Sequence, residues 1–200
     1  MTQRTTFTKE MIVEAAFSLT REVGWAGVTA RTIAQRLGSS TMPLYSSLKS
    51  MEEIEKEVRK KTEELMHDYQ RRPFAEERLL SSAVGYVVFA RDEPNLFRFL
   101  YVDRPLTQAP QGNAPNADGS AADIATVGGV VDLADQAAPA LGDPAILKSW
   151  AFTHGLASLI SSKVIDLPTD RIATLLVEAG AAFYLFADLQ KKQAQGGQNE

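Results

Sequence analysis

The chain has 200 residues, of which 44% are hydrophobic and 23% charged, as is ordinary for a globular protein. It contains no cysteine, which excludes disulfides, thiolate zinc sites and cysteine nucleophiles. No uninterrupted apolar run is long enough to span a membrane, and the polar N-terminus lacks a signal-peptide core, so we expect a cytoplasmic protein.

The net charge of −4 is unevenly distributed along the chain. Residues 1–62 carry ten Lys or Arg and seven Asp or Glu, a balance of +3, whereas the remainder has a balance of −7. A basic N-terminal segment on an acidic body indicates that only this segment would meet a phosphate backbone. This difference in charge between the two parts of the chain is modest and does not by itself identify a nucleic-acid-binding protein.

Apolar residues at helical spacing predict four helices in the first third of the chain, over residues 9–23, 30–37, 41–48 and 50–69. A serine or threonine precedes each helix and can cap its first turn, and glycine follows the first two. The start of the third helix is set by Pro43. Proline has no N–H and is tolerated only in the first turn, so Ser40 is the predicted cap.

The rest of the chain is also predicted to be helical. Helices are expected over about 74–91, 95–101, 144–162 and 169–191, with a weaker one over 121–137. Residues 103–120 are rich in Pro, Gly and Asn and predict a loop, either a lid or a linker, and the last eight residues predict a disordered tail. We find no internal repeat and no strand alternation, so the predicted fold class is all-α.

The second and third predicted helices have the spacing of a helix-turn-helix. Ala34 would allow close helix approach, Gly38 would take the positive φ of the turn, and Leu44 would pack the second helix on the first. That motif directs the outer face of its second helix into a major groove. Small polar side chains on this face would let the backbone approach DNA, and their hydroxyls can bond phosphates or base edges.

A longer stretch, FTKEMIVEAAFSLTREVGWAGVTARTIAQRLGSSTMPLYSSLKSMEEIEKEV, resembles the DNA-binding head of the TetR family of transcriptional regulators. The similarity lies in Ile12 with Ala15-Ala16 and Leu19, Gly24-Trp25, Thr29-x-Arg31-x-Ile33-Ala34, Gly38-x-Ser40, Leu44-Tyr45 and Lys49-Ser50. The resemblance covers about the first 60 residues. It implies a helix-turn-helix domain over 1–49, a connecting helix over 50–69, and an effector-binding and dimerisation domain over 70–200.

The resemblance also implies a homodimeric regulator, most consistent with a repressor, that binds a palindromic operator in double-stranded DNA and is released by a small-molecule effector. The predicted DNA-contacting residues are Arg4, Thr29, Arg31, Ser40, Thr41, Pro43, Tyr45, Ser46 and Lys49. Thr41 and Met51 stand where the family usually carries basic residues. This departure keeps open an alternative, a helical interaction module on the same fold without operator binding.

In the second half, Trp150-x-x-x-His154-Gly155 is similar to the Trp-His-Gly pattern of one group of TetR-type C-terminal domains. The predicted effector pocket is Tyr86, Phe97, Tyr101, Trp150 and His154, and His154 is alternatively a core or interface histidine. The apolar, aromatic-rich middle of the chain favours an apolar or aromatic effector. The last two predicted helices are expected to pack with their copies as a four-helix dimer interface, which includes Ile172, Leu176 and Phe183.

An enzyme is not expected. The two histidines lie on different predicted helices, and there is no cysteine nucleophile and no glycine-rich phosphate loop. No metal site and no cofactor are predicted.

Overall fold

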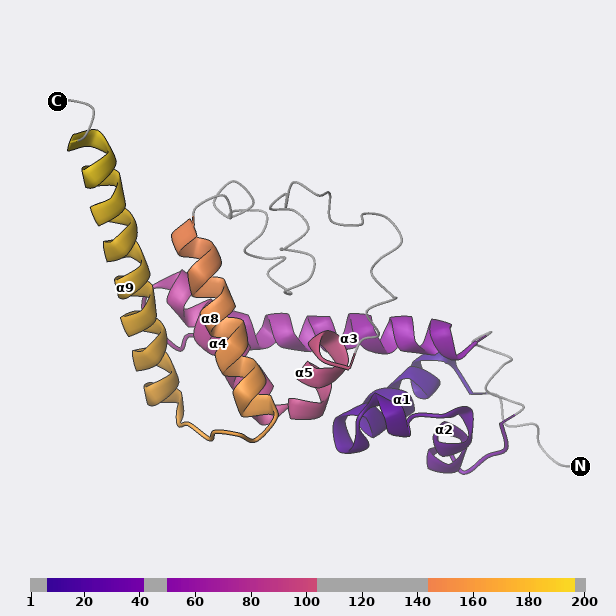
Figure 1. The fold of residues 1–200 in the computed structure, drawn as a ribbon. Helices are drawn as coiled ribbons and strands as arrows, with labels where there is room; N and C mark the ends of the chain where they lie inside the picture. The colour runs from indigo at the N-terminus through magenta and orange to yellow at the C-terminus, as the bar shows by residue number, and fades with distance from the viewer. Residues whose placement is uncertain (1–6, 42–49, 104–143, 197–200) are drawn as a thin grey trace, which may run out of the picture.

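The computed structural model describes residues 7–41, 50–103 and 144–196, and these ranges contain helices and no strand (Figure 1). The prediction of an all-α fold is therefore confirmed. The elements are α1 (Lys9–Val23), η1 (Trp25–Gly27), α2 (Ala30–Arg36), α3 (Met51–Arg71), α4 (Arg78–Asp92), α5 (Pro94–Tyr101), α8 (Pro144–Ser161) and α9 (Thr169–Gly196). The helices predicted over 41–48 and 121–137, and nearly all of the loop predicted over 103–120, lie outside the described residues.

The first two helices begin and end where their local signals predict. The Thr8 hydroxyl accepts a hydrogen bond from the Met11 N–H at 3.3 Å, and Thr29 and Thr32 form a reciprocal capping box. At the end of α2, Gly38 has φ +65°, a conformation that favours glycine. The N–H groups of Gly38 and Ser39 bond to the carbonyls of Gln35 and Ala34, which is the hydrogen-bond pattern of a Schellman turn.

The long helix α3 connects the N-terminal helices to the rest of the molecule (Figure 1). Its first turn is capped by Ser50, whose hydroxyl accepts a hydrogen bond from the Glu53 N–H at 3.2 Å. Its buried side chains recur every three or four residues and form one face: Ile54, Val58, Thr62, Met66 and Tyr69. That face packs on α1 near its start and on α4 near its end.

The prediction that the next helix begins at Phe74 is wrong, because α4 begins at Arg78. The Ser81 hydroxyl accepts hydrogen bonds from the N–H groups of Phe74 and Ala75 and donates one to the Arg72 carbonyl. These bonds hold the preceding segment in a turn. Glu77 then caps α4 by accepting from the N–H groups of Leu79 and Leu80.

Helices α3 and α4 touch through their backbones at Gly85. A Cβ atom placed at this position would lie 2.4 Å from the Tyr69 carbonyl oxygen and 2.8 Å from the Gln70 Cα. Only glycine fits at this crossing, so α4 packs directly against the backbone at the C-terminal end of α3.

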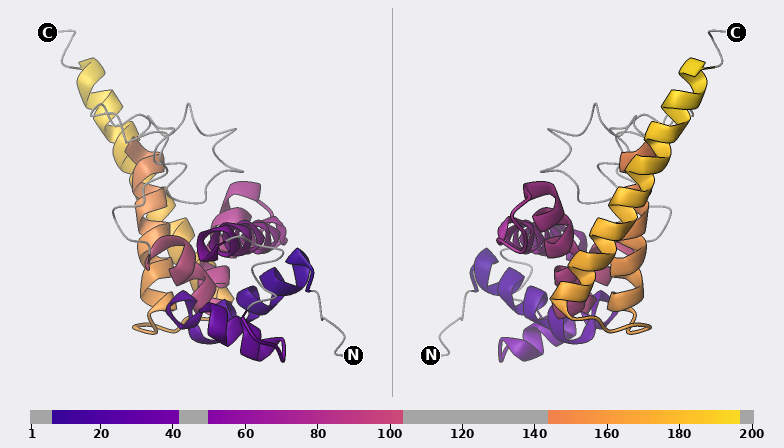
Figure 2. Two further views of the ribbon diagram at one scale, coloured as in Figure 1. Left: turned by 90° about the vertical axis from the view of Figure 1, so that its right-hand side faces the viewer. Right: turned by 90° about the vertical axis from the view of Figure 1, so that its left-hand side faces the viewer.

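Helix α9 packs on α4 and α8 through one face, and its C-terminal half projects beyond α8 (Figures 1 and 2). It continues to Gly196, so the predicted disordered tail is wrong for residues 193–196. Thr169–Gln190 has a mean hydropathy of 1.6, and only 11% of it is buried. This segment is long and apolar enough to cross a membrane by length and composition alone, which does not conflict with the expectation from sequence.

Candidate functional site

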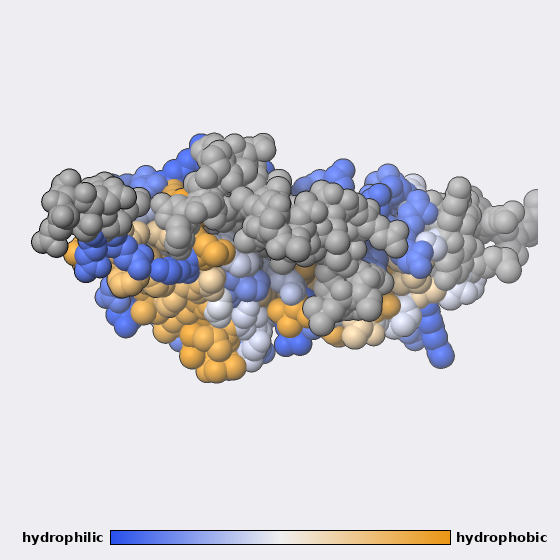
Figure 3. Space-filling view, turned by 45° about the horizontal axis from the view of Figure 1, so that its top comes forward, coloured by the Kyte–Doolittle hydropathy of each residue, from blue (hydrophilic) through white to orange (hydrophobic). Residues whose placement is uncertain are grey.

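A cavity of about 350 Å³ lies between α4, α8 and α9, beside the C-terminal end of α3. Most of its wall is apolar, and four aromatic side chains line it, namely Tyr86, Trp150, Phe152 and Tyr184. Its size is at the lower end of the range for sites that bind small organic molecules. Apolar surface gathers at the same end of the molecule, over α8 and α9 (Figure 3).

The five residues predicted for the effector pocket form one cluster of rings. Trp150 stacks on His154 with centroids 5.4 Å apart, and His154 packs against Tyr86, Phe97 and Tyr101 at 5.9–6.3 Å. Only Tyr86 and Trp150 reach the cavity wall. The other three residues lie behind these two and support them.

The two phenol hydroxyls of this cluster have hydrogen-bond partners inside the protein. The Tyr86 hydroxyl lies 2.9 Å from Nδ1 of His154, and the Tyr101 hydroxyl donates to the sulfur of Met66. Burial raises the pKa of both phenols and lowers the pKa of His154, so all three groups are neutral near pH 7. The contact with Nδ1 of His154 therefore orients the Tyr86 hydroxyl.

The cavity wall also contains four polar residues, and three of them are already engaged. The hydroxyls of Ser149 and Thr153 donate to carbonyls of their own helix, and the Glu77 carboxylate caps α4. The fourth is Gln70, which is 8% exposed and whose Oε1 atom is buried without a hydrogen-bond partner. Sequence analysis did not single out Gln70, because nothing local distinguishes one glutamine near a helix end from another.

The cavity offers no metal site. Within the described ranges, no group of three or more His, Asp or Glu side chains could hold a metal ion.

Four of the predicted DNA-contacting residues lie in the described part of the N-terminal unit. Thr29, Arg31, Ser40 and Thr41 are all exposed. Thr29 uses its hydroxyl to cap α2, and Arg31 has no ion-pair partner among the described residues. Arg4, Pro43, Tyr45, Ser46 and Lys49 lie outside the described residues.

Most of the other basic residues near this unit are paired with carboxylates. Lys9 pairs with Glu57, Lys61 with Glu14, Arg36 with Glu22, and Arg21 with Glu93. The positive balance of the first 62 residues thus overstates the charge available to a phosphate backbone.

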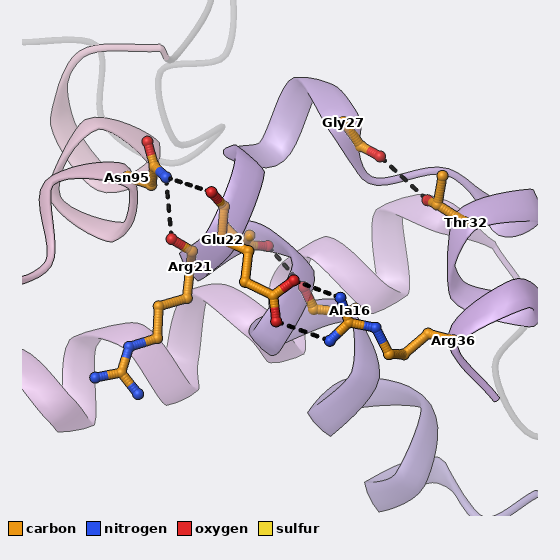
Figure 4. A network of polar contacts seen from close by, with 8 residues as sticks. Ala16, Arg21, Glu22, Gly27, Thr32, Arg36 and Asn95 are labelled. Atoms are coloured by element: carbon orange, nitrogen blue, oxygen red, sulfur yellow. Dashed lines mark hydrogen bonds and ion pairs between the residues drawn. The ribbon is translucent and has the colours of Figure 1, made fainter.

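A network of polar contacts joins α5 to the end of α1 and to α2 (Figure 4). The Asn95 amide donates to the carbonyls of Arg21 and Glu22 at 3.0 and 3.2 Å, and Arg36 donates two bonds to the Glu22 carboxylate. The Arg21 side chain forms a bidentate ion pair with Glu93, which is 4% exposed.

The same short helix α5 carries Phe97 and Tyr101 of the ring cluster, and its Phe99 packs on Trp25 with centroids 5.1 Å apart. Together with α3, α5 therefore forms a second connection between the cavity region and the N-terminal unit.

The residues predicted for the dimer interface lie mainly inside the chain. Ile172 is fully buried and Leu176 nearly so, and Phe183 is half-buried against Phe152. The exposed apolar side chains of α9 are a different set: Val177, Tyr184, Leu185, Phe186 and Leu189.

The protein is thus all-α, with a small N-terminal helical unit and, among its later helices, an aromatic-lined cavity large enough for a small organic molecule. Residues 79–180, about half of the chain, match the family described as "Tetracyclin repressor-like, C-terminal domain". The chain therefore belongs to the TetR family of regulators, the family that the resemblance of its first 60 residues predicts. The Trp-His-Gly subgroup stays a prediction. No curated protein is significantly similar to the chain.

Proposed function

We propose that the protein is a ligand-responsive transcriptional repressor that binds a palindromic operator as a homodimer. The observation that carries this proposal is the family membership of residues 79–180, together with the capped α1–α2 unit and its exposed Thr29, Arg31 and Ser40. The remaining contacts would come from Arg4, Thr41, Pro43, Tyr45, Ser46 and Lys49. As in other regulators of this kind, the protein would act in the cytoplasm.

The cavity between α4, α8 and α9 is the proposed effector site. Its polar wall residue Gln70 is in the last turn of α3, and Tyr86 contacts the rings carried by α5. A ligand that favours one position of these helices would alter the spacing of the two heads in the dimer. By linkage, operator DNA would then weaken ligand binding by the same factor.

The exposed apolar face of α9 is the proposed dimer interface. A second copy would cover side chains such as Leu185, which is 63% exposed in the single chain. Insertion into a membrane fits this helix less well, because Glu178 lies near the middle of the apolar segment. A charged residue there would cost about 2.5–3.5 kcal/mol.

The dimer proposal is tested by Leu185→Glu, which places a charge in the proposed interface without disturbing the core of the chain. The variant should sediment as a folded monomer at concentrations where the unmodified protein is a dimer. If it remains dimeric, the interface lies elsewhere.

DNA binding is tested with the purified protein and DNA from around its own gene, titrated with salt. Because each phosphate contact contributes about 0.9 to the slope of log K against log salt, Arg31→Ala in both subunits should lower the slope by about two. Arg78→Ala removes an exposed arginine on α4 and should leave the slope unchanged.

Specific DNA binding that falls steeply with salt and is lost in Tyr45→Ala would support the regulator. The ion pairing of Lys9, Arg21, Arg36 and Lys61 favours a second candidate, an interaction module that keeps the fold without operator binding. Absence of specific, salt-dependent binding by a folded dimer, with and without cavity ligands, would favour that candidate.

A further inference from the structure

We propose that the cavity takes a neutral, largely apolar molecule with one hydroxyl or N–H group, which donates a hydrogen bond to Oε1 of Gln70. The inference deepens the proposed function, since it assigns the chemical class of the effector. Binding to the cavity can nevertheless be measured without DNA.

The first argument is the unpaired oxygen of Gln70. Buried polar side chains in folded proteins almost always have a hydrogen-bond partner, and those that lack one require an explanation. The Gln70 side chain is more than nine-tenths buried, it lines the cavity, and its Oε1 has no partner. This oxygen is itself buried, so the Gln70 amide would rotate toward the cavity for a ligand donor to satisfy it.

The second argument is the charge of the wall. Among the described residues, no lysine or arginine lines the cavity, and the one carboxylate among them, that of Glu77, already accepts two backbone N–H groups. A ligand carboxylate or phosphate would lose its hydration without gaining a cation, which is strongly unfavourable. The described part of the wall therefore disfavours anionic ligands.

The third argument is the shape and polarity of the remaining surface. Apart from Gln70, the carboxylate of Glu77 and the engaged hydroxyls of Ser149 and Thr153, the described wall consists of aliphatic and aromatic side chains. Trp150 and Tyr86 present rings to it. A volume of about 350 Å³ suits a molecule of one to three rings. The ligand is therefore mainly apolar, with a single polar end.

The position of Gln70 also indicates how such a ligand would act. Gln70 is the penultimate residue of α3, and its Cα lies beneath Gly85 at the α3–α4 crossing. A hydrogen bond to its side chain would therefore act on the end of the helix that leads to the N-terminal unit. A purely apolar molecule could fill the cavity without this bond.

The test uses three probes of one shape, measured by calorimetry with the full-length protein: 2-naphthol, 2-methoxynaphthalene and 2-naphthoate. We expect 2-naphthol to bind about three- to ten-fold more tightly than its methyl ether, the range for one neutral hydrogen bond. We expect 2-naphthoate to bind at least about ten-fold more weakly than 2-naphthol. In Gln70→Leu the preference for 2-naphthol over the ether should disappear.

Two further variants locate the binding. Gly180 lines the cavity, and a Cβ there would meet no atom within 4 Å, so Gly180→Leu should fill the cavity and abolish binding of all three probes. Gln35→Leu, on the exposed surface of α2, is the matched control and should bind as the unmodified protein does. Circular dichroism confirms that each variant is folded.

The proposal is overturned if 2-naphthoate binds as tightly as 2-naphthol, if the ether binds as tightly as 2-naphthol, or if no probe binds. It is also overturned if Gln70→Leu keeps the preference or Gly180→Leu binds normally. The comparison of the three probes does not depend on any variant being stable. A protein that binds 2-naphthol as expected but no DNA would refute the regulator and leave this inference standing.

Discussion

Replacing Gly85 by alanine tests the backbone contact between α3 and α4. The added methyl group would lie 2.4 Å from the Tyr69 carbonyl oxygen and 2.8 Å from the Gln70 Cα, whereas ordinary contacts begin at 3.4 Å. Because both neighbours are backbone atoms, neither can rotate away. The two helices must separate by about 1 Å, which is the shift needed to restore ordinary van der Waals contact.

Two opposing effects set the change in the free energy of unfolding that we expect for Gly85→Ala. Overpacking of a core costs about 1–3 kcal/mol, and a clash with backbone lies at the upper end of that range. Alanine in place of glycine inside a helix returns about 1 kcal/mol through its better helix propensity. We therefore expect Gly85→Ala to lower the free energy of unfolding by about 2 kcal/mol.

Gly155 provides the matched control. It is also inside a helix, α8, but it is exposed and a Cβ there would meet no atom within 4 Å. Gly155→Ala should therefore raise stability by up to about 1 kcal/mol, because only the propensity effect operates. Urea unfolding at equal protein concentration measures both variants. If Gly85→Ala raises the midpoint as Gly155→Ala does, or leaves it unchanged, the contact at Gly85 does not determine how α3 and α4 pack.

Two more predictions concern the ring cluster and the connection to the N-terminal unit. Burial lowers the pKa of His154 below its unfolded value of about 6.5, so its contribution to stability is complete above that pH and is lost as the pH falls toward the folded-state pKa. Urea unfolding between about pH 7.5 and 5 should therefore show a shallower loss of stability for His154→Gln than for the unmodified protein. A matching effect of His67→Gln would contradict this assignment. Asn95→Ala should lower stability by about 1 kcal/mol, because the carbonyls of Arg21 and Glu22 lose their donor, while calorimetric binding of 2-naphthol stays unchanged. Unchanged stability would show that Asn95 does not support this connection.

Local signals in the sequence were sufficient for the first helices. Thr8, Thr29 and Ser50 cap the helices that were predicted to follow them, and Gly38 ends α2 with positive φ. A capping side chain bonds to a backbone group only two or three residues away, so the determinants of these boundaries lie next to one another in the chain.

The start of α4 and the role of Gln70 depended on more distant contacts. Ser81 turns the chain between Arg72 and Ala75, and Gln70 lines a cavity whose other walls belong to three later helices. Neither contact has a counterpart in the local pattern of residues.

The sequence by itself determined that this chain is helical, where its first helices begin, and which aromatic residues beyond the N-terminal unit gather together. Only the tertiary structure decided which of those rings reach the cavity and which face of α9 is left for a second copy. The physical reason is that α9 is apolar on nearly all sides. Helical periodicity identifies a buried face only when a polar face opposes it. The burial of Ile172 and the exposure of Leu185 were therefore set by the positions of α4 and α8.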